Sequence, residues 1–220
     1  MILIKIFFSL VVLVIFLGCG DDDSTSVVNT NEYNVQAIAT TELNMNLNLV
    51  YSTGLTGTMS FSTVYTGDSF VNGIPVQNIR ESATLVGSET TASTSIDVKY
   101  DSNGIALELV DSDGVICTLQ NTPTPLPITG KVGDSSTVSG EYACTDGTSS
   151  TKKWSLLDAG NGNAYMIFTI TDYDSANNIE FISKEKLTLN ASSVVTYYNI
   201  DMDLVSLGVT ATGSGTVQYQ

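Results

Sequence analysis

Apolar and polar residues alternate along most of this chain. Between Leu43 and Leu49 every second residue is apolar, and each position between is an asparagine. Alternation with a period of two residues is typical of a β-strand with one buried face. Similar alternation recurs in residues 59–63, 96–100, 105–109, 115–119, 138–144, 154–156, 165–169 and 194–204. The pattern predicts about 11 or 12 strands and no helix other than a turn near Tyr33–Thr40.

Turn sequences separate these alternating segments. Asn103-Gly104 and Asp113-Gly114 are typical hairpin pairs, because both central residues of a tight hairpin must tolerate a positive φ. Short connections between consecutive strands favour antiparallel pairing of neighbours. The sequence therefore predicts an all-β fold, an antiparallel meander of about 11–12 strands that forms a curved sheet or barrel.

One proline-rich segment breaks this rhythm. Residues 121–127 hold three of the four prolines of the chain, and proline cannot donate to a regular strand ladder. The segment either links two small β-sandwiches, residues 33–119 and 128–220, or crosses over within a single sheet. No sequence repeat relates the two halves, which favours one domain over residues 33–220.

The first 18 residues form a distinct apolar segment. Lys5 is its only charge, and Ser9 alone interrupts the apolar run from Ile6 to Leu17. The run is shorter than the roughly 20 residues that a transmembrane helix needs. A basic start, an apolar centre and a small residue before the break are typical of a secretory signal peptide. We therefore expect residues 1–18 to be removed.

The stretch Phe16-Leu17-Gly18-Cys19 resembles the lipobox of bacterial lipoproteins, with Phe16 where that family usually has leucine. The resemblance implies cleavage before Cys19, a diacylglyceryl group on its sulfur and acylation of the new amino terminus. It also implies attachment to a membrane of the bacterial cell envelope through this lipid. Where an aspartate after the cysteine retains lipoproteins in the inner membrane, Gly20 implies outer-membrane delivery, on either the periplasmic or the surface face.

Charge restricts the partners of the mature chain. The sequence has 8 basic and 23 acidic residues and a net charge of −15. Removing residues 1–18 takes away only Lys5, so 7 basic residues and a net charge of −16 remain. No segment is rich in lysine or arginine, which argues against nucleic acid as a partner. Anionic lipids would repel such a domain, so we expect membrane contact through the lipid alone. Residues 19–32 are polar and acidic and are predicted to form a disordered tether.

Two cysteines remain once Cys19 is assigned to the lipid. In an oxidising compartment, Cys117 and Cys144 are expected to form a disulfide that contributes about 3 kcal/mol to stability. The alternative is two separate buried thiols. Because the two cysteines flank the proline-rich segment, a disulfide would favour one domain over two.

The side chains present exclude many kinds of catalysis. The chain has no histidine, which removes Ser-His-Asp and Cys-His nucleophiles and most zinc or iron sites. Two carboxylates alone can hydrolyse glycosides, but the sequence marks no acidic residue as buried beside an apolar group. Two acidic turns, Asp111–Gly114 and Asp172–Asn178, contain oxygen ligands suited to calcium, and we interpret them as ordinary turn residues. We predict no catalytic residue, no metal site and no cofactor.

Two functions from different classes follow from these observations. The first is a non-catalytic binding or carrier module, in which the barrel holds an apolar small ligand. Aromatic residues in the alternating segments, including Tyr142, Trp154, Phe168 and Tyr198, are then expected in the core or along the cavity wall. The alternative is a structural or interaction protein that exposes an acidic β surface to other envelope proteins or to glycans. A third and less favoured interpretation is a membrane-spanning barrel, since about a dozen alternating strands could span a membrane, but the segments lack clear aromatic girdles.

Overall fold

The computed structural model describes residues 29–36, 42–87, 91–121 and 126–219, and most of these residues are in strands. Within them, no helix is long and apolar enough to cross a membrane. The elements are β1 (Glu32–Asn34), β2 (Leu43–Tyr51), β3 (Thr56–Val71), β4 (Ile74–Val86), β5 (Thr91–Tyr100), β6 (Ala106–Asp111), β7 (Ile116–Leu119), β8 (Thr129–Lys131), β9 (Ser135–Cys144), β10 (Ser149–Gly160), β11 (Asn163–Tyr173), β12 (Ile179–Leu189), β13 (Val195–Leu204), a short 3₁₀ helix η2 (Val205–Leu207) and β14 (Val209–Tyr219).

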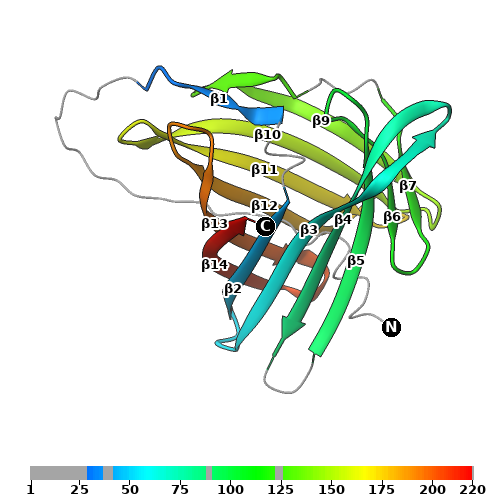
Figure 1. The fold of residues 1–220 in the computed structure, drawn as a ribbon. Helices are drawn as coiled ribbons and strands as arrows, with labels where there is room; N and C mark the ends of the chain where they lie inside the picture. The colour runs from blue at the N-terminus through cyan, green and yellow to red at the C-terminus, as the bar shows by residue number, and fades with distance from the viewer. Residues whose placement is uncertain (1–28, 37–41, 88–90, 122–125, 220) are drawn as a thin grey trace.

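Twelve of the described strands form one closed antiparallel barrel (Figure 1). Each strand pairs with its neighbours in sequence, except that β7 pairs directly with β9 because β8 leaves the barrel to pair with β1. The predicted all-β meander in one domain is confirmed. The alternative of two small sandwiches is wrong, because the connection that contains the proline-rich segment is a crossover within a single sheet.

The barrel closes where its first strand, β2, pairs with its last strand, β14. Two glycines of β14 allow this close approach. A Cβ atom at Gly213 would overlap the side chains of Ile200 and Leu49, and one at Gly215 would overlap the carbonyl oxygen of Asn46. A larger residue at either position would therefore push the last strand away from its neighbours.

The alternating pattern directs apolar side chains into the barrel. On β2, Met45 and Leu47 are buried, whereas Asn46 and Asn48 face outward and are exposed. β13 follows the same rule, and the adjacent Tyr197 and Tyr198 lie on opposite faces as their positions predict. The outer face of β2 between Leu43 and Leu49 is therefore formed by asparagines.

The strip formed by β1 and β8 covers one end of the barrel, beside the β10–β11 turn (Figure 1). Tyr33 of β1 is completely buried in the main core. Its hydroxyl group donates a hydrogen bond to the carbonyl oxygen of Gly162 (2.8 Å). The side-chain amides of Asn29 and Asn31 donate to the carbonyl oxygens of Asn163 (2.7 Å) and Gly162 (2.8 Å). These bonds fix the strip to the barrel.

The same contacts bear on the predicted tether. Residues 29–32 belong to its predicted range of 19–32, yet the side chains of Asn29 and Asn31 are hydrogen bonded to the barrel. Within the described residues, the segment before β1 is therefore already in contact with the barrel at Asn29. The signal-peptide and lipidation predictions, including Cys19, lie outside the described residues.

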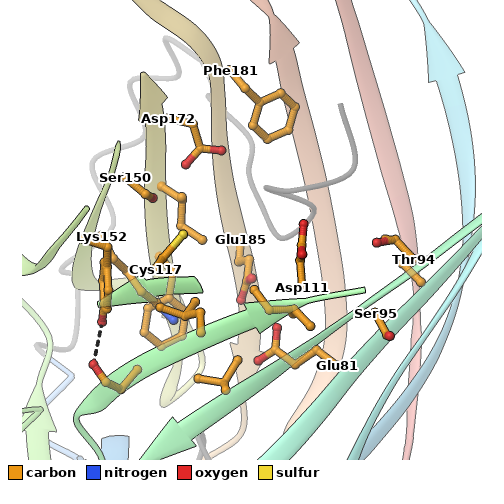
Figure 2. Close-up of a pocket in the computed structure, with 18 of the residues that line it drawn as sticks. Glu81, Thr94, Ser95, Asp111, Cys117, Ser150, Lys152, Asp172, Phe181 and Glu185 are labelled. Atoms are coloured by element: carbon orange, nitrogen blue, oxygen red, sulfur yellow. Dashed lines mark hydrogen bonds between the residues drawn. The ribbon is translucent and has the colours of Figure 1, made fainter. Parts of the chain in front are cut away.

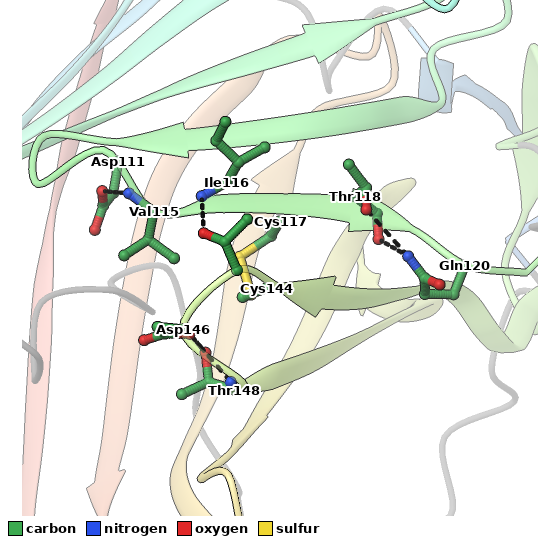
Figure 3. Close-up of a disulfide and its surroundings, with 10 residues drawn as sticks. Asp111, Val115, Ile116, Cys117, Thr118, Gln120, Cys144, Asp146 and Thr148 are labelled. Atoms are coloured by element: carbon green, nitrogen blue, oxygen red, sulfur yellow. Dashed lines mark hydrogen bonds between the residues drawn. A yellow bond between two sulfur atoms is a disulfide. The ribbon is translucent and has the colours of Figure 1, made fainter.

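A disulfide joins Cys117 of β7 to Cys144 of β9, as the sequence predicts (Figure 3). The two residues are direct partners across the ladder, with Cα atoms 3.9 Å apart. β7 has only four residues and only three partners on β9, so the ladder of the barrel is short at this point. The disulfide holds the barrel closed where few backbone hydrogen bonds do so.

Replacing both cysteines by alanine (C117A together with C144A) should lower the free energy of unfolding by about 3 kcal/mol, because the unfolded chain regains loop entropy. For a domain of this size the expected fall in Tm is about 6–12 °C. Differential scanning calorimetry of the variant and the oxidised wild type measures it. An unchanged Tm, or two free thiols in the unreduced wild type, would contradict this role.

Candidate ligand-binding cavity

Side chains do not fill the whole interior of the barrel. The larger apolar cluster draws mainly on β2, β3 and β10–β14 and includes Phe61 and Phe168. A smaller cluster contains Ile79, Val98 and Tyr100 of β4 and β5. A cavity of about 260 Å³ is lined by members of both clusters. It therefore lies inside the barrel, between the two packed regions.

The cavity is open at one end of the barrel. Its lining includes Asp146 of the β9–β10 turn and Ser206 of η2, and both residues are exposed. The β9–β10 and β10–β11 turns lie at opposite ends of β10, and the β1–β8 strip binds to the second of these turns at Gly162. The mouth of the cavity is therefore at the end that the strip leaves uncovered.

The lining of the cavity is strongly acidic. Among its described residues a single cation, Lys152, is outnumbered by six carboxylates: Glu81, Asp111, Asp146, Asp172, Glu180 and Glu185. Figure 2 shows Glu81 of β4 and Glu185 of β12 directed into the same space. These two strands are far apart in the strand order of the barrel, so the two carboxylates converge from different walls.

Glu185 is the most deeply placed of these acids. Only 7% of its surface is exposed, and no hydrogen bond to its carboxylate is found among the described residues. Burial raises the pKa of Glu185 to about 8, the positive charge of Lys152 opposes this shift, and the negative charge of Glu81 adds to it. Burial likewise raises the pKa of Glu81, against the effect of Lys152. Glu185 is therefore mostly protonated at neutral pH.

Three tyrosines line the same cavity as these carboxylates. Burial raises the pKa of Tyr100 and of Tyr198, and the negative charges of Glu81 and Glu185 raise them further. Burial also raises the pKa of Tyr142, and its hydroxyl group donates to the carbonyl oxygen of Ala106 (3.0 Å). All three hydroxyl groups stay protonated at physiological pH.

Lys152 shows that the cavity wall already accommodates an ammonium group. Its Nζ atom lies 4.7 Å from the centroid of the Phe168 ring, within the range of a cation–π interaction. Its charge also acts on Glu81 and Glu185. One lysine supplies a single positive charge toward two carboxylates, so ionisation of both leaves an excess negative charge.

Asp172 lies nearer the mouth. Burial raises its pKa to about 7, a hydrogen bond from the Ser150 hydroxyl lowers it, and the nearby charge of Glu180 raises it. Ser150 is the direct partner of Asp172 across the β10–β11 ladder. Asp172 therefore titrates close to neutral pH, like Glu185 deeper in the cavity.

The two acidic turns bind their own backbone, as we interpreted them from the sequence. The Oδ1 atom of Asp111 accepts hydrogen bonds from the N–H groups of Asp113 (2.9 Å) and Val115 (2.7 Å). Asp174 does the same for Ala176 and Asn178. Over the described residues, no group of three or more histidine, cysteine or acidic side chains is placed to hold a metal ion.

The residues singled out from the sequence and the cavity overlap only in part. Cys117, Cys144, Tyr142, Phe168 and Tyr198 all line the cavity. Sequence reasoning missed the charged group formed by Glu81, Lys152 and Glu185. The available signal was a charge at an inward position of a strand: Glu185 stands two residues before Leu187, which is buried on the same face.

Fold and site together define the class of this protein: a closed antiparallel barrel with an acidic, aromatic-lined cavity that is open at one end. Comparison of the chain with protein-family profiles, with curated proteins and with solved structures finds no match.

The raised pKa of Glu185 predicts how stability depends on pH. Between about pH 4.5 and 8 the folded protein holds a proton at Glu185 that the unfolded chain has lost, so this group makes stability fall as pH rises. The substitution Glu185→Gln removes this loss of stability at high pH. We expect the variant to match the wild type at pH 5 and to exceed it by about 2 kcal/mol or more at pH 9, as measured by urea unfolding.

The matched control is Glu141→Gln, because Glu141 lies exposed beside Tyr142 and faces away from the cavity. It should leave the pH profile unchanged. Parallel profiles for Glu185→Gln and the wild type would show that Glu185 is not buried as described.

Proposed function

We propose that this protein is a lipid-anchored binding or carrier protein of the bacterial cell envelope, and that it holds a small ligand inside its barrel. The cavity of about 260 Å³, open at one end, is the observation that supports this function most directly. Barrels that are wider than their side chains can fill commonly enclose ligands. Met45, Phe61 and Leu187 offer apolar contacts within the cavity.

The proposed role is binding without catalysis. The chain has no histidine, and the two cysteines in the cavity wall are joined to each other. The barrel instead offers an enclosed space with apolar, aromatic and acidic surfaces, which is the composition of a site that selects and holds a molecule.

The proposed anchor leaves the mouth of the cavity accessible. Nine residues separate Cys19 from Asn29, which corresponds to at most about 36 Å of chain. Asn29 is bound beside the β10–β11 turn, at the covered end of the barrel. A lipid on Cys19 would thus attach the protein to the outer membrane from the covered end, while the open end exchanges ligand.

Native mass spectrometry tests the carrier function. The chain from residue 20 onward, exported with a cleavable signal peptide in place of residues 1–19, should carry a small organic molecule that denaturation releases. Ala83→Phe should reduce occupancy, because Ala83 lines the cavity and a larger side chain would fill it. Thr84→Phe is the control, since Thr84 faces outward and hydrogen bonds Ser93 (2.9 Å). A ligand-free wild type, or equal loss in both variants, would contradict the proposal.

The anchor is tested by Cys19→Ser. The wild type should be recovered in the membrane fraction with a fatty-acylated amino terminus. The variant should be released or remain unprocessed, because serine has no thiol to receive the diacylglyceryl group. A variant that is still cleaved before residue 19 and still acylated would contradict the anchor.

A further inference from the structure

We infer that the ligand of this cavity is a small organic cation, with an ammonium group held between Glu81 and Glu185 and an apolar body packed on the surrounding rings. This inference rests on the proposed carrier function and names the class of ligand. The enclosed shape of the cavity limits the size of the ligand, and the side chains that line the cavity select the charge of the ligand.

The position of Glu185 is the first observation in its support. The side chain is more than nine-tenths buried and points into the cavity (Figure 2), and its carboxylate receives no hydrogen bond from the described residues. In its ionised form, which predominates above about pH 8, this buried carboxylate without a close partner costs free energy in the empty protein. A cationic ligand would supply the missing partner, so the cost is recovered on binding.

Charge balance is the second observation. Glu81 and Glu185 approach the same space from β4 and β12, and Lys152 is the only cation in the described lining. Above about pH 8, where Glu185 has lost its proton, a second positive charge is needed to neutralise both carboxylates. A neutral ligand would leave this imbalance in place, and an anion would increase it.

The aromatic lining is the third observation, independent of the acids. Tyr100, Tyr198, Phe168 and Phe181 line the same cavity as the two glutamates. The faces of aromatic rings attract ammonium groups, and Lys152 already makes this contact with Phe168. Rings combined with carboxylates favour an ammonium that carries carbon substituents, because the rings also offer apolar contact to those substituents.

The acidic residues at the mouth of the cavity also favour a cationic ligand. Asp111, Asp146, Asp172 and Glu180 line its outer part, and the chain as a whole carries a net charge of −15. An opening lined by one sign of charge concentrates ligands of the opposite sign and accelerates their association. Cations would thus reach the deep glutamates faster than neutral or anionic molecules of the same shape.

Binding of a cation would be coupled to the loss of a proton. The groups that face Glu185 are Lys152 of β10, Glu81 of β4, Tyr100 of β5 and Tyr198 of β13. Glu185 is mostly protonated below pH 8, and a protonated carboxyl attracts an ammonium weakly. Affinity for a cation should therefore rise as pH increases through 8, whereas affinity for a neutral analogue should not change.

The test uses three probes with the same six-carbon chain: hexylammonium, 1-hexanol and hexanoate. Isothermal titration calorimetry with the mature chain, stripped of any bound molecule, compares them at pH 6 and pH 9. Hexylammonium should bind most tightly at pH 9 and about tenfold or more weaker at pH 6. Hexanol should bind with an affinity independent of pH, and hexanoate should bind most weakly.

Two substitutions test whether the cavity glutamates are responsible for the affinity for hexylammonium. Glu185→Gln should reduce hexylammonium affinity at pH 9 by about tenfold and leave hexanol affinity unchanged, and Glu81→Gln should act in the same direction if the first variant fails to fold. Glu141→Gln, on the outer face, should match the wild type. Circular dichroism of each variant confirms that the barrel is intact.

The outcomes separate this inference from the carrier function on which it rests. Hexanol or hexanoate binding as tightly as hexylammonium at pH 9 would overturn the cationic ligand and leave the carrier intact. The same holds if Glu185→Gln and Glu81→Gln fold and bind hexylammonium like the wild type. If no probe binds and the wild type also carries no ligand in native mass spectrometry, the carrier function and this inference fail together.

Discussion

Closure of a twelve-stranded sheet is the constraint on which the rest of this structure depends. Closure requires every second side chain of each strand to point into an enclosed interior. An eight-stranded barrel is just narrow enough for side chains to fill, and width grows with the number of strands. Here the side chains gather into two apolar clusters instead of one, and the cavity lies between them. The cavity is thus a consequence of strand number as much as of any individual residue.

The stability of the barrel offsets the cost of a polar interior. Glu185 is buried and Glu81 is partly buried at a cost in free energy, as the raised pKa values of both groups indicate. The contacts that hold the wall are elsewhere: the close approach of β14 at Gly213, the disulfide at Cys117, and Tyr33 in the covering strip. Charged side chains in the interior at one place, with favourable packing and covalent contacts around them, are typical of a binding site.

The sequence predicts those features that depend on local pattern. Alternation over Leu43–Leu49 corresponds to β2, and the opposite orientation of Tyr197 and Tyr198 follows from their adjacency in β13. Closure was not predictable in this way, because it depends on pairing between β2 and β14 at opposite ends of the chain. The cavity was missed for a related reason. Glu81 and Glu185 are charges at inward positions, and they interrupt the very alternation by which strands are recognised, so neither β4 nor β12 is among the predicted segments.

The disulfide connects the site to the environment in which the protein folds. Cys117 and Cys144 line the cavity as well as closing the barrel, so oxidation of the two cysteines joins two strands of the cavity wall covalently. Disulfides persist in exported proteins and are rare in the cytosol. The resemblance around Cys19 implies export, and the residues that carry it lie outside the described part of the chain. Two separate parts of the sequence therefore favour the same compartment, and in that compartment the short β7 ladder gains the covalent link that it lacks in the reduced chain.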